Sequence, residues 1–165
     1  MNEYTLVKLV HLGALIFWLG PALGAWFVFK AVEDSEYLAG SAGHKVSRVF
    51  FYTIVLEHIA FAVLLATGFY MALDYGWLGA EWLSQKLTIV MLVIVPLEVV
   101  DVVLGNWLAN SATKKLYAGA VLKPWEQVGL RLYHGAFTKL ALLIMPLAVI
   151  AVMYLAIGKL EFTLW

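Results

Sequence analysis

The sequence predicts an all-α protein, an integral membrane bundle of four transmembrane helices, and three observations lead to that prediction. First, 64% of the 165 residues are hydrophobic and only 13% are charged, whereas soluble domains are roughly 45–50% apolar and about 25% charged. A chain this short cannot bury such an excess in one core. Second, four stretches each hold the roughly 20 mostly apolar residues that a membrane-crossing helix needs. Third, 15% of the residues are aromatic, including 7 Trp, which membrane interfaces favour.

The four helices are predicted as a single domain over residues 1–165, with short connections between them. In chain order they cover about residues 4–30, 46–74, 86–109 and 127–158. The first is interrupted only by Lys8 and His11, and the second carries Glu57 and His58 inside its apolar run. Each of these polar residues therefore stands where a membrane helix would normally be apolar.

The connection before the third helix and the remaining two helices follow the same pattern. Trp77 and Trp82 precede the third helix, which suits a segment at the membrane interface. Within the third helix, Glu98 and Asp101 stand at i and i+3 and so share one helix face. The fourth helix is uncharged over 140–158, so its second half is the part best suited to cross a bilayer.

Gly20 and Gly24 form a GxxxG motif around Pro21 in the first helix. Small residues at this spacing let two helix backbones approach closely. The motif therefore predicts one of three arrangements: the seam of a homodimer, a packing seam inside the bundle, or clearance for a porphyrin.

Charge and cysteine content exclude several function classes. Lysine plus arginine (11) balances aspartate plus glutamate (11), so no basic excess points to nucleic acid as a partner. Cysteine is absent, which excludes disulfides, thiolate metal sites and cysteine nucleophiles. Basic residues gather after the first and third helices, and such segments stay in the cytoplasm. We therefore expect a multi-pass protein of the bacterial inner (plasma) membrane with both termini outside.

Ionisable residues fall in two layers when each helix is measured at a rise of 1.5 Å per residue. His11 and Lys86 share the layer near the outer surface. The central-to-cytoplasmic layer holds Glu57, His58, Glu98, Asp101, His134 and Lys139. Ionisable groups inside a bilayer cost at least about 2.5–3.5 kcal/mol each on insertion scales, and they are usually paired and functional.

His11 is the predicted axial ligand of a haem b, with Lys86 or a second histidine opposite. Neutral imidazole is a standard ligand of haem iron, and haem occupies an apolar slot between helices. Trp18 lies on the helical face of His11 and is expected to line that slot. The alternative is a structural histidine that hydrogen-bonds a carbonyl of a neighbouring helix.

The central layer has the residue types of a non-haem divalent metal centre: Glu57, His58, Glu98, Asp101 and His134. Without thiolates, such a site suits Zn, Mn, Fe(II) or Cu(II). The Glu-x-x-His pair of a di-iron bundle is absent, which counts against that type of site. A second haem between His58 and His134 is one alternative. The other, which we favour, is an ion-pair or proton-relay network in which Lys139 or Arg131 neutralises the carboxylates.

Two segments resemble the HemJ-type protoporphyrinogen oxidases, which are small bacterial haem-b membrane proteins. One is Tyr-Thr-Leu-Val-Lys-Leu-Val-His at 4–11, followed by Phe-Trp at 17–18, and the other is Trp-Leu-Ser-Gln-Lys-Leu at 82–87. The resemblance implies that His11 and Lys86 take part in haem binding. The helix layout is similar also to CopD-like copper-resistance membrane domains and to a broad group of small four-helix membrane proteins.

The leading prediction is therefore a haem-b redox protein of the lipid bilayer, a homodimer with oxidoreductase activity. It would pass electrons between haem and a quinone, a porphyrinogen or another small reductant, while the central carboxylates handle coupled protons. Two alternatives stay open. One is a non-haem metal-binding or proton-coupled metal transport protein that uses the central residues, and the other is a structural subunit of a membrane complex.

Overall fold

The computed structural model describes residues 2–33 and 41–159, which are helical apart from short connections and contain no β-strand. Within them, four runs are long and apolar enough to cross a membrane: Glu3–Val28, Gly43–Asp74, Glu81–Tyr117 and Pro124–Gly158. The predicted all-α class and the four long apolar helices are confirmed. The helices that contain these runs begin before each predicted segment and end at or beyond its last residue.

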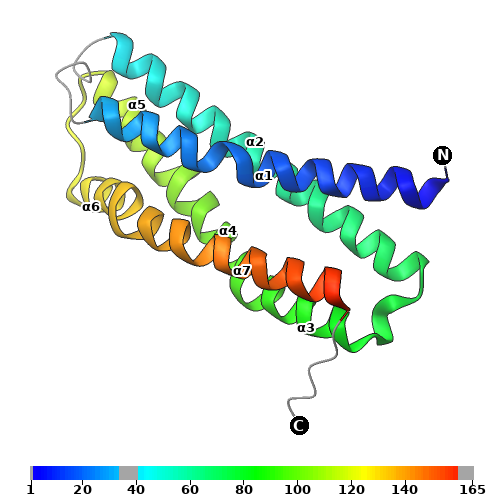
Figure 1. Ribbon diagram of the computed structural model, residues 1–165. Coiled ribbons are helices and arrows are strands. Elements are labelled where there is room, and N and C mark those ends of the chain that lie inside the picture. The colour runs from blue at the N-terminus through cyan, green and yellow to red at the C-terminus, as the bar shows by residue number, and fades with distance from the viewer. Residues whose placement is uncertain (1, 34–40, 160–165) are drawn as a thin grey trace.

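The first two runs belong to continuous α-helices, α1 (Glu3–Glu33) and α2 (Ser41–Asp74). These helices form an antiparallel pair that is packed together (Figure 1). After α2 the chain turns through Gly76, whose φ of 66° is left-handed and costs glycine no steric clash. A short 3₁₀ helix, η2 (Trp77–Gly79), then leads into the third run.

The third and fourth runs alternate α-helical with π-helical segments. The third consists of α3 (Glu81–Ile89), η3 (Val90–Ile94), α4 (Val95–Asp101), η4 (Val102–Ala109) and α5 (Asn110–Tyr117), of which η3 and η4 are π-helical. The fourth consists of α6 (Pro124–Leu132), the π-helical η5 (Tyr133–Phe137) and α7 (Thr138–Gly158). Single π-helical turns inside α-helices occur frequently at functional sites. Here η3 and η4 enclose the short helix that carries Glu98 and Asp101.

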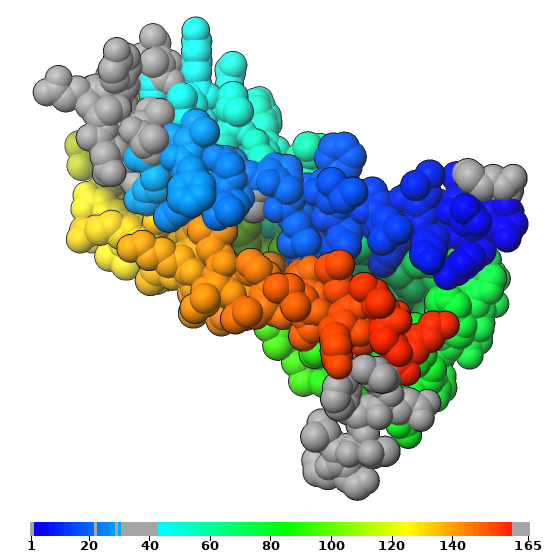
Figure 2. All heavy atoms as spheres, in the orientation of Figure 1, coloured from blue at the N-terminus to red at the C-terminus, as the bar shows by residue number. Residues whose placement is uncertain are grey.

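The four runs pack as a bundle. α1 lies on α2, α2 also contacts η4 and α5, and the fourth run contacts the third through α6 on η4 and α7 on α3. Figure 2 shows α1 and the fourth run at the surface of the same face. The start of α1 and the end of α7 lie at one end of the bundle, as an even number of passes requires (Figure 1).

Two apolar clusters fill the interior. The cluster nearer the start of α1 includes Trp18, Phe61, Leu64, Ile94 and Val149. The other includes Phe50, Phe51, Ile54, Ala109, Tyr133 and Phe137. The buried carboxylates Glu57 and Glu98 stand between these clusters along their helices, so apolar packing encloses them from both sides.

Glycines allow the third and fourth runs to come close. A Cβ built on Gly105 would lie 2.7 Å from the hydroxyl oxygen of Tyr133, and a Cβ on Gly129 would overlap the side chain of Leu108. Ordinary contacts between such atoms are much longer. Because Tyr133 is only 2% exposed, the Gly105 crossing holds a buried tyrosine in place beside the polar residues of α4.

Candidate functional site

A cavity of about 540 Å³ lies between the helices at the end where α1 begins. Ligand pockets usually measure roughly 300–1,000 Å³ and have mainly apolar and aromatic walls. The walls of this large cavity come from α1, α2, η2, α3, η3 and α7, together with Lys159 at the end of α7. His11, Trp18 and Lys86, the residues predicted to bind a cofactor, all line it. The fold thus brings two residues of the first run and one of the third to a single space.

The His11 imidazole is oriented by α2. Its Nδ1 lies 3.0 Å from Thr67 Oγ1. Thr67 directs its single hydroxyl proton to backbone carbonyls, with Val63 O at 2.7 Å and Leu64 O at 3.1 Å. The hydroxyl oxygen therefore accepts from His11, which places the ring proton on Nδ1 and leaves a lone pair on Nε2. A neutral imidazole whose Nδ1–H is engaged in this way can ligate a metal through Nε2.

Gly68 provides the space for this histidine. A Cβ built on Gly68 would lie 3.1 Å from His11 Cε1 and 3.6 Å from Nδ1. The ring therefore rests against the backbone of α2, where a larger residue would crowd it. Thr67 and Gly68 together determine the tautomer and the position of the imidazole.

The mouth of the large cavity is aromatic and basic. It is formed by Tyr4, Trp77, Trp82, Lys8, Lys86 and Lys159. Tyr4 meets Trp77 edge-on with ring centroids 6.0 Å apart, and Trp77 lies 5.9 Å from Trp82. None of the described residues that line the cavity is acidic.

Trp18 connects the large cavity to polar residues deeper in the bundle. Its indole is 5% exposed, and its ring centroid lies 5.0 Å from that of Phe61. Its Nε1 donates a hydrogen bond to Glu98 Oε1 at 2.8 Å. A molecule in the cavity would therefore contact a residue that is itself bonded to a buried carboxylate.

The buried polar cluster consists of the buried Glu57 and Glu98 together with the half-buried His58, Asp101 and Asn106, and His58 is its centre. Nε2 of His58 lies 3.2 Å from Asp101 Oδ2 and 3.5 Å from Glu98 Oε2. Its Nδ1 lies 3.2 Å from Asn106 Nδ2. Because an amide nitrogen can only donate, Nδ1 accepts and Nε2 carries the proton that faces the two carboxylates.

Glu57 and the neighbouring Tyr133 complete this environment. Glu57 is 6% exposed, and within the described part of the chain its Oε1 has no hydrogen-bond partner. Tyr133 interacts with the Asp101 side chain. Buried polar atoms are nearly always paired, so an unpaired carboxyl oxygen calls for an explanation. The cluster contains more acidic groups than the single imidazole can balance.

The prediction that Lys139 neutralises these carboxylates is wrong. Lys139 is exposed on α7, and Glu98 and Asp101 pair instead with His58. Arg131, the other predicted cation, is exposed as well. The π-helical η5 lies directly before α7 and widens the helix, which changes the direction of the residues that follow it. Uninterrupted α-helical spacing could not anticipate that change.

His134 lies apart from the carboxylates, among aromatic rings. It is 5% exposed, and its ring lies 5.0 Å from Tyr133 and 5.9 Å from Phe50 between centroids. The predicted second haem between His58 and His134 lacks support, since both ring nitrogens of His58 already face protein groups.

The predicted metal ligands do not assemble into one site. Among residues 2–33 and 41–159, no group of three or more histidine, aspartate or glutamate side chains is placed to hold a metal ion. The groups instead contact one another directly, as in the network alternative, with His58 Nε2 at ion-pair distance from Asp101 (3.2 Å) and from Glu98 (3.5 Å).

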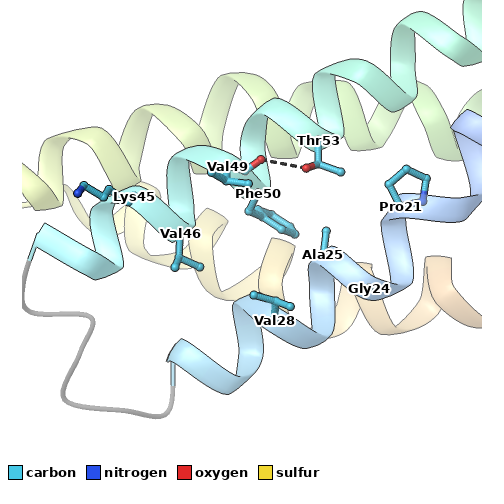
Figure 3. A pocket seen from close by; sticks show the side chains of 9 residues that line it. All are labelled: Pro21, Gly24, Ala25, Val28, Lys45, Val46, Val49, Phe50 and Thr53. Atoms are coloured by element: carbon cyan, nitrogen blue, oxygen red, sulfur yellow. Dashed lines mark hydrogen bonds between the residues drawn. The ribbon is translucent and has the colours of Figure 1, made fainter.

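A second, smaller cavity of about 430 Å³ lies between α1 and α2 toward the other end of the bundle (Figure 3). Its lining is mainly apolar, with Lys45 at one edge (Figure 3), and includes none of the predicted cofactor residues. Gly24 lines it, while Gly20 and Gly24 both have open space where a Cβ would stand. The GxxxG motif is therefore neither a packing seam within the described bundle nor part of the large cavity. The homodimer seam stays a prediction.

Several residues of the site were not found by sequence reasoning. Thr67 and Gly68 interrupt the apolar run of α2 with a hydroxyl group and a residue without a side chain, which is a usable signal of a site. Asn106 is an amide in an otherwise apolar segment, five residues after Asp101. Tyr133 carries no signal in the sequence, because its contact with the polar cluster depends on the crossing at Gly105.

Comparison of the chain with protein-family models, with curated proteins and with solved structures finds no match.

Proposed function

We propose that this protein is a membrane-embedded haem-b redox protein and that the large cavity is its haem site. The observation that carries the proposal is the oriented His11 imidazole on a cavity that Lys86 and Trp18 also line. The resemblance of the segments around His11 and Lys86 to HemJ-type proteins supports the same assignment. Electrons would pass between haem and a quinone, a porphyrinogen or another small reductant.

The residues of the large cavity fit a tetrapyrrole. Its volume of about 540 Å³ is suited to a cofactor, and its walls are largely aliphatic and aromatic. His11 would hold the haem iron through Nε2, and Lys86 would be the second candidate ligand. When bound, haem iron supplies a one-electron carrier whose potential depends on its ligands and its burial.

The exposed surface supports insertion into a lipid bilayer. Large apolar side chains are exposed on all four runs, among them Ile16 at 70%, Ile59 at 57%, Leu92 at 72% and Ile150 at 63%. Soluble monomers rarely expose contiguous apolar surface on this scale. We therefore infer a multi-pass protein of the bacterial inner membrane, with both termini outside as the basic residues favour.

The buried polar cluster supports proton coupling. Glu98 and Asp101 lie near one imidazole, that of His58, and Glu57 interacts electrostatically with both of these carboxylates. Uncompensated charge inside a bilayer is costly, and chains of acidic and histidine residues commonly carry protons there. Protons held on this cluster would compensate the negative charge of electrons that arrive in the cavity. The Trp18–Glu98 hydrogen bond links the cluster to the cavity.

A spectroscopic comparison tests the haem assignment. The full chain, expressed with sufficient iron and purified in detergent, should show a Soret band, and His11→Ala should abolish or shift it because loss of an axial ligand changes iron spin state and affinity. His44→Ala is the matched control, since His44 is exposed near the start of α2. A wild-type protein that neither contains haem nor binds added haem, or a His11→Ala variant with a normal spectrum, would refute the proposal.

A further inference from the structure

The mouth of the large cavity gathers positive charge that the haem-iron ligation does not explain. Lys8 projects from α1 and lies 5.7 Å from the centroid of the Tyr4 ring, and Lys159 lies 6.0 Å from the centroid of Trp77. Tyr4 and Trp77 are themselves in edge-on contact at 6.0 Å. The two ammonium groups thus belong to one continuous aromatic rim, and each is placed over a ring face that attracts cations.

Lys159 reaches this rim through an unusual backbone conformation. It is the C-cap of α7, with φ 45° and ψ 31°, and its N–H bonds the carbonyl of Leu155 at 3.0 Å. It is the sole described non-glycine residue with positive φ. Glycine is the usual residue at such a helix end, because a side chain there is strained. This conformation places the Lys159 side chain at the edge of the cavity, at a backbone cost that glycine would avoid.

Acidic residues do not neutralise this charge from within. None of the described residues lining the cavity is an aspartate or glutamate. Glu3, close to Lys8 in sequence, accepts a hydrogen bond of 2.5 Å from Tyr70 instead. No ion pair of Lys8 or Lys159 is found among residues 2–33 and 41–159. Within that part of the chain, the mouth therefore presents ammonium donors without an acidic partner above an apolar space.

We infer that Lys8 and Lys159 form a carboxylate-binding mouth that recognises the acidic side chains of a tetrapyrrole whose apolar body occupies the large cavity. This inference rests on the proposed function. It names the residues that would contact the tetrapyrrole in addition to those that would bind its iron. Each ammonium supplies three donors on a flexible stem, which suits a carboxylate at an entrance better than a fixed planar site. The apolar walls and the basic mouth together select a molecule with a hydrophobic ring and an anionic edge.

Metal-free protoporphyrin IX tests the inference apart from iron ligation. The full chain in nanodiscs of zwitterionic lipid is titrated with this diacid and with its dimethyl ester, and porphyrin fluorescence reports binding. The variant is Lys8→Gln/Lys159→Gln. The matched control is Lys114→Gln/Lys139→Gln, which removes two exposed lysines elsewhere.

We expect the wild type to bind the diacid at least tenfold more tightly than the ester. The Lys8→Gln/Lys159→Gln variant should bind the diacid about 10–30-fold more weakly, as expected for the loss of two solvent-exposed charge pairs, with its ester affinity unchanged. Equal affinities for diacid and ester, or a variant that behaves like the control, would overturn the inference. Oleate that displaces the diacid at equal concentration would overturn the tetrapyrrole as the ligand and assign the mouth to a fatty acid. Diacid binding in a protein that fails the His11→Ala test would refute the haem ligation alone.

Discussion

Trp18 and Glu98 are 80 positions apart, yet the Trp18 indole nitrogen donates a hydrogen bond to the Glu98 carboxylate at 2.8 Å. This contact joins the two polar regions of the molecule. On one side the indole lines the large cavity, and on the other Glu98 lies 3.5 Å from His58. If the binding of a ligand and of a proton are coupled in this protein, the coupling acts in both directions, and this hydrogen bond directly connects the two regions.

Replacing Trp18 by Phe removes the indole N–H while keeping an aromatic ring in the cavity wall. Glu98 Oε1 then loses its donor inside the bundle, which should lower the free energy of unfolding by about 1–3 kcal/mol. We also expect the reduction potential of the haem-loaded protein to depend less on pH. Denaturation in detergent and potentiometric titration at several pH values measure the two effects. Trp107→Phe is the control, because Trp107 is 73% exposed. An identical response of both variants would refute the coupling between the cavity and the polar cluster.

Thr67→Val removes the acceptor that orients His11. Valine has nearly the shape of threonine, so the helix is retained while the imidazole loses the partner of its Nδ1–H. Removing such a supporting group from a metal-ligating histidine typically weakens affinity by roughly 10–100-fold, and haem titration should show a loss of that size. Thr53→Val is a matched control on the same helix, since Thr53 also bonds a backbone carbonyl four residues earlier. Unchanged haem affinity in Thr67→Val would show that Thr67 has only a local helical role.

The sequence was sufficient to predict the four-helix architecture, because the apolar length of each helix is a local property of the chain. Apolar length alone predicts each spanning helix, and no packing detail is needed to find it. Depth counting was also enough to place His11 and Lys86 at one level, since both lie in parts of the bundle where the α-helical rise holds. The structure then showed that both line the same cavity.

Direction around the helix axis was the part that the sequence could not provide. Lys139 has the right depth for the carboxylates, but it points outward after the π-helical η5. His58 fills the role instead, through contacts with Glu98 and Asp101 on α4, which lies between the π-helical η3 and η4. Such π-helical turns arise from tertiary packing, so their position is not encoded in hydrophobic periodicity.

His58→Leu should destabilise the protein strongly. The change leaves the buried Glu98 and the half-buried Asp101 without their common partner, and removing one partner of a buried pair costs up to roughly 3–5 kcal/mol. Adding Glu98→Gln and Asp101→Asn to the same protein should recover much of the loss, because the unbalanced charge is then gone. Unfolding in detergent measures each variant, and His44→Leu serves as the control for an exposed histidine. A triple variant no more stable than His58→Leu would show that the carboxylates are not the cause.

Gly105→Ala tests the crossing that places Tyr133 beside the buried polar cluster. The added methyl would stand 2.7 Å from the Tyr133 hydroxyl oxygen and 2.8 Å from Cζ, and the buried ring has little room to move. Overpacking of this kind costs about 1–3 kcal/mol, so the unfolding midpoint should fall. In Gly13→Ala the new methyl meets no atom within 4 Å, and replacing a helical glycine by alanine should instead stabilise by up to about 1 kcal/mol. The two glycine variants should therefore move in opposite directions. A Gly105→Ala protein as stable as Gly13→Ala would mean that Tyr133 is not fixed by this crossing, and its contact with Asp101 would then need another cause.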